Sequence, residues 1–151
     1  MDSMIEKVKI DVSDMTLSDI EDNEISLADF KGKTVIMAGA KREGADEARR
    51  WGRELSKKCE SLKNVQYVRI AFVGKIPAFV PRRFIKGLLK GSGSNIPPLI
   101  AWDNDPADKM GVYDPKTPYI FVIDPKGIMR LRFRGHYTED DLSRILEHIP
   151  K

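Results

Sequence analysis

Between residues 34 and 73, an apolar run, an amphipathic segment and a second apolar run follow one another. This order constrains the fold more than any other feature of the sequence. The runs 34–40 and 65–73 are long enough to be strands buried on both faces. From about residue 44 to 62, apolar residues recur every three or four positions, which predicts a helix with one apolar face. Two buried strands joined by a helix form a parallel crossover unit, so the sequence predicts an α/β fold. The apolar face of the helix consists of Ala48, Trp51, Leu55, Cys59 and Leu62.

The C-terminal third of the chain predicts an antiparallel hairpin. Pro118 precedes the apolar run 119–123, and Asp124–Gly127 has proline and glycine at the second and fourth positions of a tight turn. Residues 129–133 then alternate between apolar and basic side chains, which predicts a strand with one exposed face. On that exposed face we place Arg130, Arg132 and Arg134.

The remaining segments fit around this core in a single domain that spans residues 1–151. Residues 1 to about 15 form an N-terminal extension with the alternation of a peripheral strand, and about 74–98 form a helical insertion. A last helix begins after Thr138, which has Asp141 three positions later in a variant of the capping box. A length of 151 residues suits one domain.

The composition is typical of a globular protein and excludes several other classes. The net charge of +3 is spread along the chain, so it does not argue for binding to nucleic acid. No apolar run approaches the ~20 residues of a membrane span. The first residues lack the basic-then-apolar order of a secretory signal, so we expect a cytoplasmic protein, with prior removal of a signal as the alternative.

A set of short motifs lies on this predicted framework, over roughly residues 14–150. They are Thr16–Asp19, Ile25–Lys33, Val35–Met37, Pro97–Asp103, Gly111–Val112, Thr117–Asp124, Gly127 and Arg134–His136. Together with the order of elements, they resemble the redoxins of the thioredoxin-like superfamily, which are thiol–disulfide reductases and thiol-specific antioxidant proteins. The resemblance implies a three-layer α/β/α sandwich. Its central mixed sheet has a strand–helix–strand half and a C-terminal antiparallel hairpin plus helix.

The residues that carry the chemistry of this family are missing. In the reductases the first buried strand leads into a Cys-x-x-Cys pair at the helix start, and counting from Val35 puts those thiols near Gly44 and Glu47. In peroxidatic relatives a threonine and a cysteine occupy the same neighbourhood. This chain has a single cysteine, Cys59, so neither activity follows from the resemblance.

Cys59 is the one possible substitute, and it has two interpretations. A reactive thiolate needs a lowered pKa, which a helix N-terminus provides. Cys59 instead lies about four turns into the predicted helix, near the end where the helix dipole opposes a thiolate. It also shares the apolar face with Trp51 and Leu55. We therefore favour an inert core cysteine over a redox role.

Pro118 is the other feature that the resemblance carries over. It implies a cis-proline facing the helix N-terminus, with the backbone of Thr117 offered to an extended partner peptide by strand addition. A proline that only shapes the start of the strand is the alternative. The candidate binding groove consists of Arg42, Glu43, Gly44, Ala45, Asp46, Thr117 and Pro118.

A basic amphipathic segment between residues 75 and 90 also has two interpretations. Since the redoxins have a core-packing helix here, we favour a solvated basic face above a buried apolar one. A membrane surface or an acidic partner is the alternative. Its cations are Lys75, Arg82, Arg83, Lys86 and Lys90, and its apolar residues are Phe84, Ile85, Leu88 and Leu89.

The sequence predicts no catalytic residues, cofactor or metal. Glu43, Asp46 and Glu47 have no histidine or cysteine near them in the sequence to complete a metal site. Neither His136 nor His148 has a sequence neighbour that would make a catalytic pair.

The function that the sequence favours is therefore non-catalytic. We expect a redoxin-type domain without the active-site dithiol that is redox-inactive and binds a protein or an extended peptide through the candidate binding groove. We expect no nucleic acid and no membrane span, and the sequence predicts no particular oligomeric state. The alternative is an oxidoreductase or antioxidant of the redoxin class that uses Cys59 or a partner's thiol.

Overall fold

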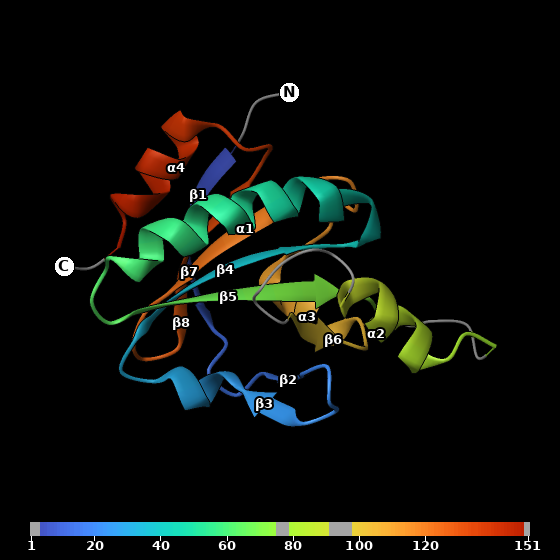
Figure 1. Ribbon diagram of the computed structural model, residues 1–151. Coiled ribbons are helices and arrows are strands. Elements are labelled where there is room, and N and C mark those ends of the chain that lie inside the picture. Colours follow the sequence, from blue (N-terminus) through green and yellow to red (C-terminus); the bar gives the residue numbers. More distant parts are fainter. Residues whose placement is uncertain (1–3, 75–78, 91–97, 150–151) are drawn as a thin grey trace.

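The computed structural model describes residues 4–74, 79–90 and 98–149, and its centre is one eight-stranded mixed sheet (Figure 1). The strands lie in the order β1-β8-β7-β4-β5-β6-β2-β3. They are β1 (Met4–Asp11), β2 (Thr16–Ser18), β3 (Glu24–Ser26), β4 (Thr34–Ala40), β5 (Val65–Phe72), β6 (Leu99–Ala101), β7 (Tyr119–Ile123) and β8 (Ile128–Arg134). The α-helices are α1 (Ala45–Glu60), α2 (Arg82–Lys90), α3 (Asp105–Met110) and α4 (Glu139–Leu146), and the 3₁₀ turns are η1 (Leu27–Phe30) and η2 (Arg42–Gly44).

The crossover unit predicted from the sequence forms the middle of the sheet. Strands β4 and β5 are parallel and in register from Thr34 opposite Val65 to Ala40 opposite Ala71, with α1 between them in sequence. Every residue of β4 is buried, as a strand covered on both faces requires. On the other side, β7 runs antiparallel to β4, and β8 pairs back onto β7.

The N-terminal segment supplies strands to both edges of the sheet. Strand β1 pairs antiparallel with β8 at one edge, as the alternation of residues 5–12 predicts. The hairpin of β2 and β3 continues the opposite edge, where Ser18 lies opposite Ile100 of β6. The chain between β1 and β2 therefore crosses one face of the sheet, and Val12 and Met15 are buried there.

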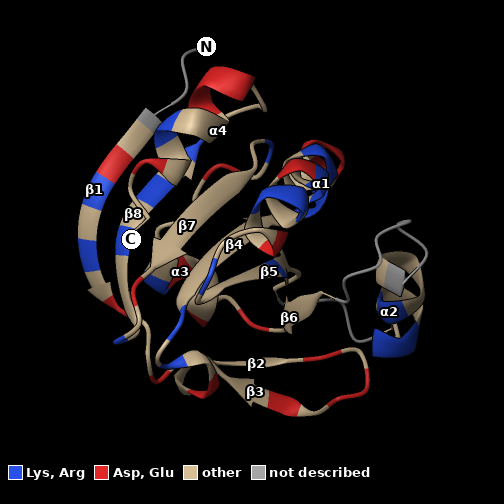
Figure 2. Cartoon of the chain, turned by 60° about the vertical axis from the view of Figure 1, so that its left-hand side comes forward, with Lys and Arg blue, Asp and Glu red and all other residues tan. Residues whose placement is uncertain are grey.

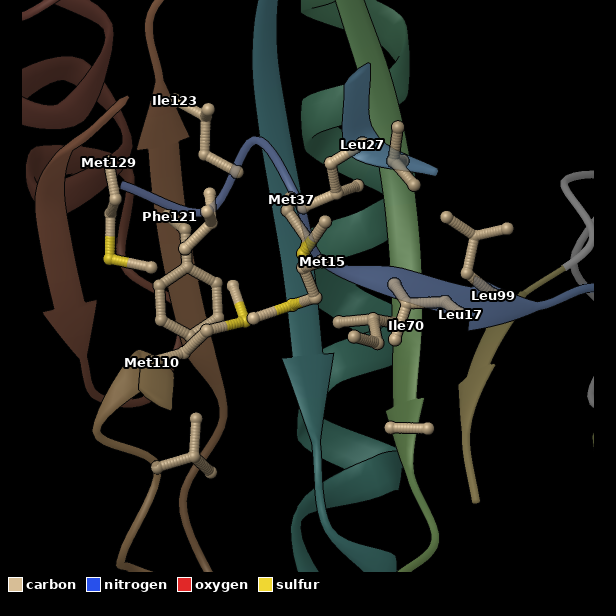
Figure 3. Close-up of a cluster of buried hydrophobic side chains, with 14 of the residues drawn as sticks. Met15, Leu17, Leu27, Met37, Ile70, Leu99, Met110, Phe121, Ile123 and Met129 are labelled. Carbon is tan, nitrogen blue, oxygen red and sulfur yellow. The ribbon is translucent and has the colours of Figure 1, made fainter. Parts of the chain in front are cut away.

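Two apolar cores fill the space between three layers. Helices α1 and α4 cover one face, where Trp51, Leu55 and Cys59 pack against Ile36 and other apolar residues of the sheet (Figure 1). The opposite face is covered by α3, η1 and the crossing N-terminal segment. Figure 3 shows this second core. Its labelled residues are Met15, Leu17, Leu27, Met37, Ile70, Leu99, Met110, Phe121, Ile123 and Met129. The expected three-layer α/β/α sandwich is confirmed.

Two of the three arginines placed on the exposed face of the hairpin are covered, so that prediction is wrong for them. The Arg132 side chain is 14% exposed, and its Nη1 donates to the carbonyl oxygen of Met110 at 2.9 Å. Its Nη2 lies 3.1 Å from the Glu6 carboxylate, while Arg134 pairs with Asp114 at 3.3 Å. The reason is that α3 and the chain after it cover this face, that Glu6 of the neighbouring strand β1 lies beside Arg132, and that the carbonyl end of α3 attracts a cation.

Helix α2 differs from its sequence-based expectation as well. It lies beyond β6 at the margin of the molecule (Figure 1), and its Phe84 and Leu88 are each 59% exposed. The expectation of a buried apolar face is therefore wrong for these two residues. Helix α2 belongs to the insertion expected over about 74–98, of which residues 75–78 and 91–97 lie outside the described residues, Lys75 among them.

Candidate functional site

The candidate site lies where β4 ends and α1 begins. After Ala40 the chain passes through η2 and enters α1 with Gly44 as its N-cap residue, whose lack of a side chain leaves the first turn without a side-chain cap. Asp46 and Glu47 supply negative charge in that first turn, which the free N–H groups of a helix start favour. Asp46 also forms an ion pair with Arg49. Gly44, where the resemblance to the reductases implies the first thiol, thus lies at a helix start that carries negative side chains.

Gly44 packs against the loop before β7. A Cβ built on Gly44 would stand 3.1 Å from the carbonyl carbon of Thr117, 3.2 Å from its oxygen and 3.3 Å from the Cβ of Ala40. The structure therefore brings together the two sides of the candidate groove that the sequence predicts. It also shows that they touch at Gly44, so the space for a side chain there is almost closed.

The residues of the candidate groove differ in their exposure. Gly44 and Pro118 are buried, and Thr117 is half-buried. The exposed members come from η2 and the first turn of α1, and they are Arg42, Glu43, Ala45 and Asp46. Gly44 and Pro118 therefore form the floor of this surface, and a partner would meet mainly the η2–α1 side.

Asp114 fixes the position of Thr117. The Thr117 hydroxyl donates to Asp114 Oδ2 at 2.8 Å, and the N–H of Lys116 donates to Asp114 Oδ1 at 2.9 Å. The Lys116 N–H and the Thr117 hydroxyl hold the pKa of Asp114 below its usual range, with a smaller contribution from the charge of Arg134. The carboxylate thus remains ionised and keeps the loop in place at neutral pH.

The expectation of a cis-proline at position 118 is wrong. The described residues contain no cis peptide bond, and the Thr117–Pro118 bond is therefore trans. The Asp114 turn delivers the chain to β7 with this bond in the isomer that an X–Pro peptide intrinsically prefers. The Pro118 carbonyl then accepts a hydrogen bond from the N–H of Gly135 at 3.2 Å, inside the protein.

The site also contains a contact between two residues that sequence reasoning named but did not pair, His136 and Glu47. His136 Nδ1 lies 3.3 Å from the carboxylate of Glu47, the residue near the position of the second thiol, and both side chains are about half exposed. Beside them, the Trp51 indole N–H donates to the carbonyl of Gly135 at 3.0 Å. The motif Arg134–His136 was the available signal, but nothing in the sequence pairs it with the start of α1.

Cys59 lies in the core and away from the site. It is 6% exposed on the inner face of α1, and burial raises its pKa to about 11. Fifteen residues of helix separate it from Gly44, which is roughly 20 Å at ~1.5 Å per residue. Burial and pKa therefore both disfavour a thiolate at neutral pH.

No metal centre or membrane span is visible in the part of the chain that the structure describes. Within it, no three His, Cys, Asp or Glu side chains are grouped to hold a metal ion. None of its helices has the length and apolarity to cross a bilayer.

Comparison with known proteins gives the family. The model of the AhpC/TSA family matches residues 8–132. The chain belongs to the AhpC/TSA family. No curated protein sequence matches this AhpC/TSA-family chain.

Solved structures agree with the fold of this family member. A DsbF homologue from Corynebacterium diphtheriae is similar with a TM-score of 0.68 at 18% identity, over 97% of this chain and 92% of that one. The exposed lipoprotein thioredoxin Etrx1 from Streptococcus pneumoniae has a TM-score of 0.68 at 19% identity, over 90% of this chain and 99% of that one. A secreted thiol-disulfide isomerase from Corynebacterium glutamicum has a TM-score of 0.68 at 16% identity, over 94% and 89%. Similarity at this identity shows a thioredoxin-like fold.

These neighbours overturn the expected cytoplasmic location. The Corynebacterium glutamicum protein is described as secreted and the pneumococcal one as an exposed lipoprotein, so the comparison points away from the cytoplasm. The expectation rested on the first residues of the chain.

Proposed function

We propose that this AhpC/TSA-family domain is redox-inactive and acts as a binding module. The observation that supports this most strongly is the contact between Gly44 and Thr117, since it fills the position where the reductases of the family have a thiol. The buried Cys59, with its raised pKa, offers no replacement. A chain of this kind keeps the framework of the family without its nucleophile.

The binding surface in this proposal is centred on the start of α1. Arg42, Glu43, Ala45 and Asp46 are exposed there, beside the half-buried Thr117, with Gly44 and Pro118 as the floor. This surface has charges of both signs and the free N–H groups of a helix start. Both can pair with the backbone carbonyls and with the charged side chains of a partner. We infer that the partner is a protein segment or an extended peptide.

A pair of matched variants tests this surface. A random peptide library is selected on the wild-type protein, and the dissociation constants of the selected peptides are measured by fluorescence anisotropy. Ala45→Arg places a long side chain on the proposed surface, and we expect it to weaken binding at least tenfold. Ser143→Arg adds the same side chain at an exposed position of α4 and serves as the control. Peptides that bind both variants equally well would show that the surface lies elsewhere.

A thiol-dependent oxidoreductase is the second candidate, because the chain belongs to a family with such members and resembles thiol–disulfide exchange proteins in fold. In this alternative Cys59 or a partner's thiol supplies the chemistry. The alkylation rate of Cys59 separates the two candidates. Fast labelling of the native protein at neutral pH supports the oxidoreductase, whereas labelling only after unfolding supports the binding module.

A further inference from the structure

Helix α2 and the turn that precedes it expose three large apolar side chains. Phe84 and Leu88 lie one helical turn apart and are each 59% exposed, and Phe79 is 85% exposed. The other large exposed apolar residues in the described ranges, Leu62 and Tyr113, lie on different elements. We call Phe79, Phe84 and Leu88 the α2 apolar patch.

The charge of α2 is of one sign. The helix contains Arg82, Arg83, Lys86 and Lys90 and no acidic residue. Figure 2 shows it at the margin of the molecule, coloured only blue and tan apart from an undescribed grey part. Beside its exposed apolar groups the helix therefore offers an exposed cation, Arg83, and no acidic side chain of its own, which complements a partner that is both apolar and anionic.

Two contacts hold α2 to the domain without covering the patch. Lys86 forms an ion pair with Asp22 of the β2–β3 turn at 2.5 Å and is only 17% exposed. The Arg82 guanidinium lies over the Trp102 ring, 4.7 Å from its centroid. The helix is therefore anchored through its basic side chains, and Phe84 and Leu88 remain exposed.

We propose that the α2 apolar patch docks this domain on an anionic lipid surface. At the boundary between headgroups and acyl chains, a bilayer offers an apolar layer for Phe79, Phe84 and Leu88 and anionic headgroups for the exposed Arg83. The three side chains expose roughly 300–400 Å² in total, which is about half of what one partner contributes to a standard protein interface of ~800 Å² per side. That area suits shallow, reversible insertion better than a stable complex with another protein.

This docking is independent of the proposed peptide surface but sets its orientation. Helix α2 follows β5 and the start of α1 follows β4, and these two strands are parallel neighbours. The start of α1 and helix α2 therefore both follow the C-terminal ends of their strands, on the same end of the sheet. A domain docked through α2 therefore has the start of α1 at the same end of the sheet as the lipid surface.

Vesicle co-sedimentation tests the proposal with the full chain. The protein is incubated at low salt with phosphatidylglycerol–phosphatidylcholine vesicles and with phosphatidylcholine vesicles. We expect at least tenfold stronger partitioning to the anionic vesicles and loss of most of it in moderate salt. Equal partitioning to both compositions, or none to either, would overturn the proposal.

Two double variants assign the binding to the patch. Phe84→Gln with Leu88→Gln keeps good helix formers on α2 and is expected to weaken vesicle binding at least tenfold. Leu62→Gln with Tyr113→Gln removes the exposed apolar residues outside the patch and is expected to leave it unchanged. Circular dichroism confirms that both variants are folded. If vesicles do not bind but an acidic amphipathic peptide does, and the α2 variant abolishes that binding, then the patch has a protein partner and the lipid proposal is wrong.

Discussion

Gly44 lies against the backbone of Thr117, with 3.1 Å between the Thr117 carbonyl carbon and the position of a Cβ on Gly44. This contact joins the start of α1 to the loop before β7. It occurs at the position where the resemblance to the reductases implies the first thiol. A side chain at Gly44 would therefore have little room beside Thr117.

Gly44→Ala is expected to destabilise the protein by about 1–3 kcal/mol, because the added methyl meets backbone atoms of Thr117 that cannot rotate away. The gain from a stiffer unfolded chain, about 0.4–1 kcal/mol, is smaller. Gly87→Ala is the matched control, since nothing lies within 4 Å of a Cβ at that position of α2, and it is expected to stabilise by up to about 1 kcal/mol. Urea unfolding measures both, and equal effects of the two substitutions would contradict the close contact at Gly44.

Trp51→Phe is expected to lower the free energy of unfolding by about 2 kcal/mol. The substitution removes the indole N–H that donates to Gly135 and leaves a cavity between Phe133 and Tyr137, whose rings pack edge-on against Trp51. Urea unfolding followed by circular dichroism measures the change. A loss below about 0.5 kcal/mol would show that this buried contact does not support the site.

Arg132→Met and Arg130→Met compare two arginines of the same strand. Arg132 is nearly buried and bonds both the Met110 carbonyl and Glu6, whereas the Arg130 side chain is 49% exposed and pairs with Asp124. We expect a loss of about 1–3 kcal/mol for Arg132, because its removal leaves the carbonyl oxygen of the buried Met110 without this donor, and at most about 1 kcal/mol for Arg130. Thermal unfolding ranks the two, and the reverse order would be inconsistent with the burial described above.

Much of the fold could be predicted from the sequence because its signals are local. The spacing of apolar residues over 34–73 predicts the bounds of β4, α1 and β5 to within a few residues. The alternation of residues 5–12 predicts the edge strand β1. Thr138 caps α4, as its spacing to Asp141 indicates. Each of these signals is contained within one element, so tertiary packing does not alter it.

What the sequence could not predict depends on contacts between distant segments. The low exposure of Arg132 follows from α3 packing over β8 and from Glu6 of the neighbouring strand β1, and the pairing of Glu47 with His136 follows from the way the β8–α4 corner meets α1. The exposure of Phe84 and Leu88 could not be predicted either, because an amphipathic pattern predicts an apolar face but does not show whether another element covers it.

Titration of Cys59 should make stability depend on pH in the alkaline range. Its pKa is about 11 in the folded protein and about 8.5 when unfolded, so the native state keeps a proton that the unfolded state releases. The contribution is complete below about pH 8.5 and is lost as pH rises toward 11, by roughly 2–3 kcal/mol. The free energy of unfolding from pH 7 to 11, measured against Cys59→Ala, isolates this loss. Parallel curves for the two proteins would mean that Cys59 is accessible to water.

Turnover by the native protein tests most directly whether this member of the AhpC/TSA family has lost thiol chemistry. Disulfide reduction with dithiothreitol as the electron donor and peroxide consumption are measured for the wild type and for Cys59→Ser. We predict rates equal to the protein-free baseline for both proteins, because the thiol positions are Gly44 and Glu47 and the only cysteine is buried. A rate above baseline in the wild type that Cys59→Ser abolishes would contradict the account.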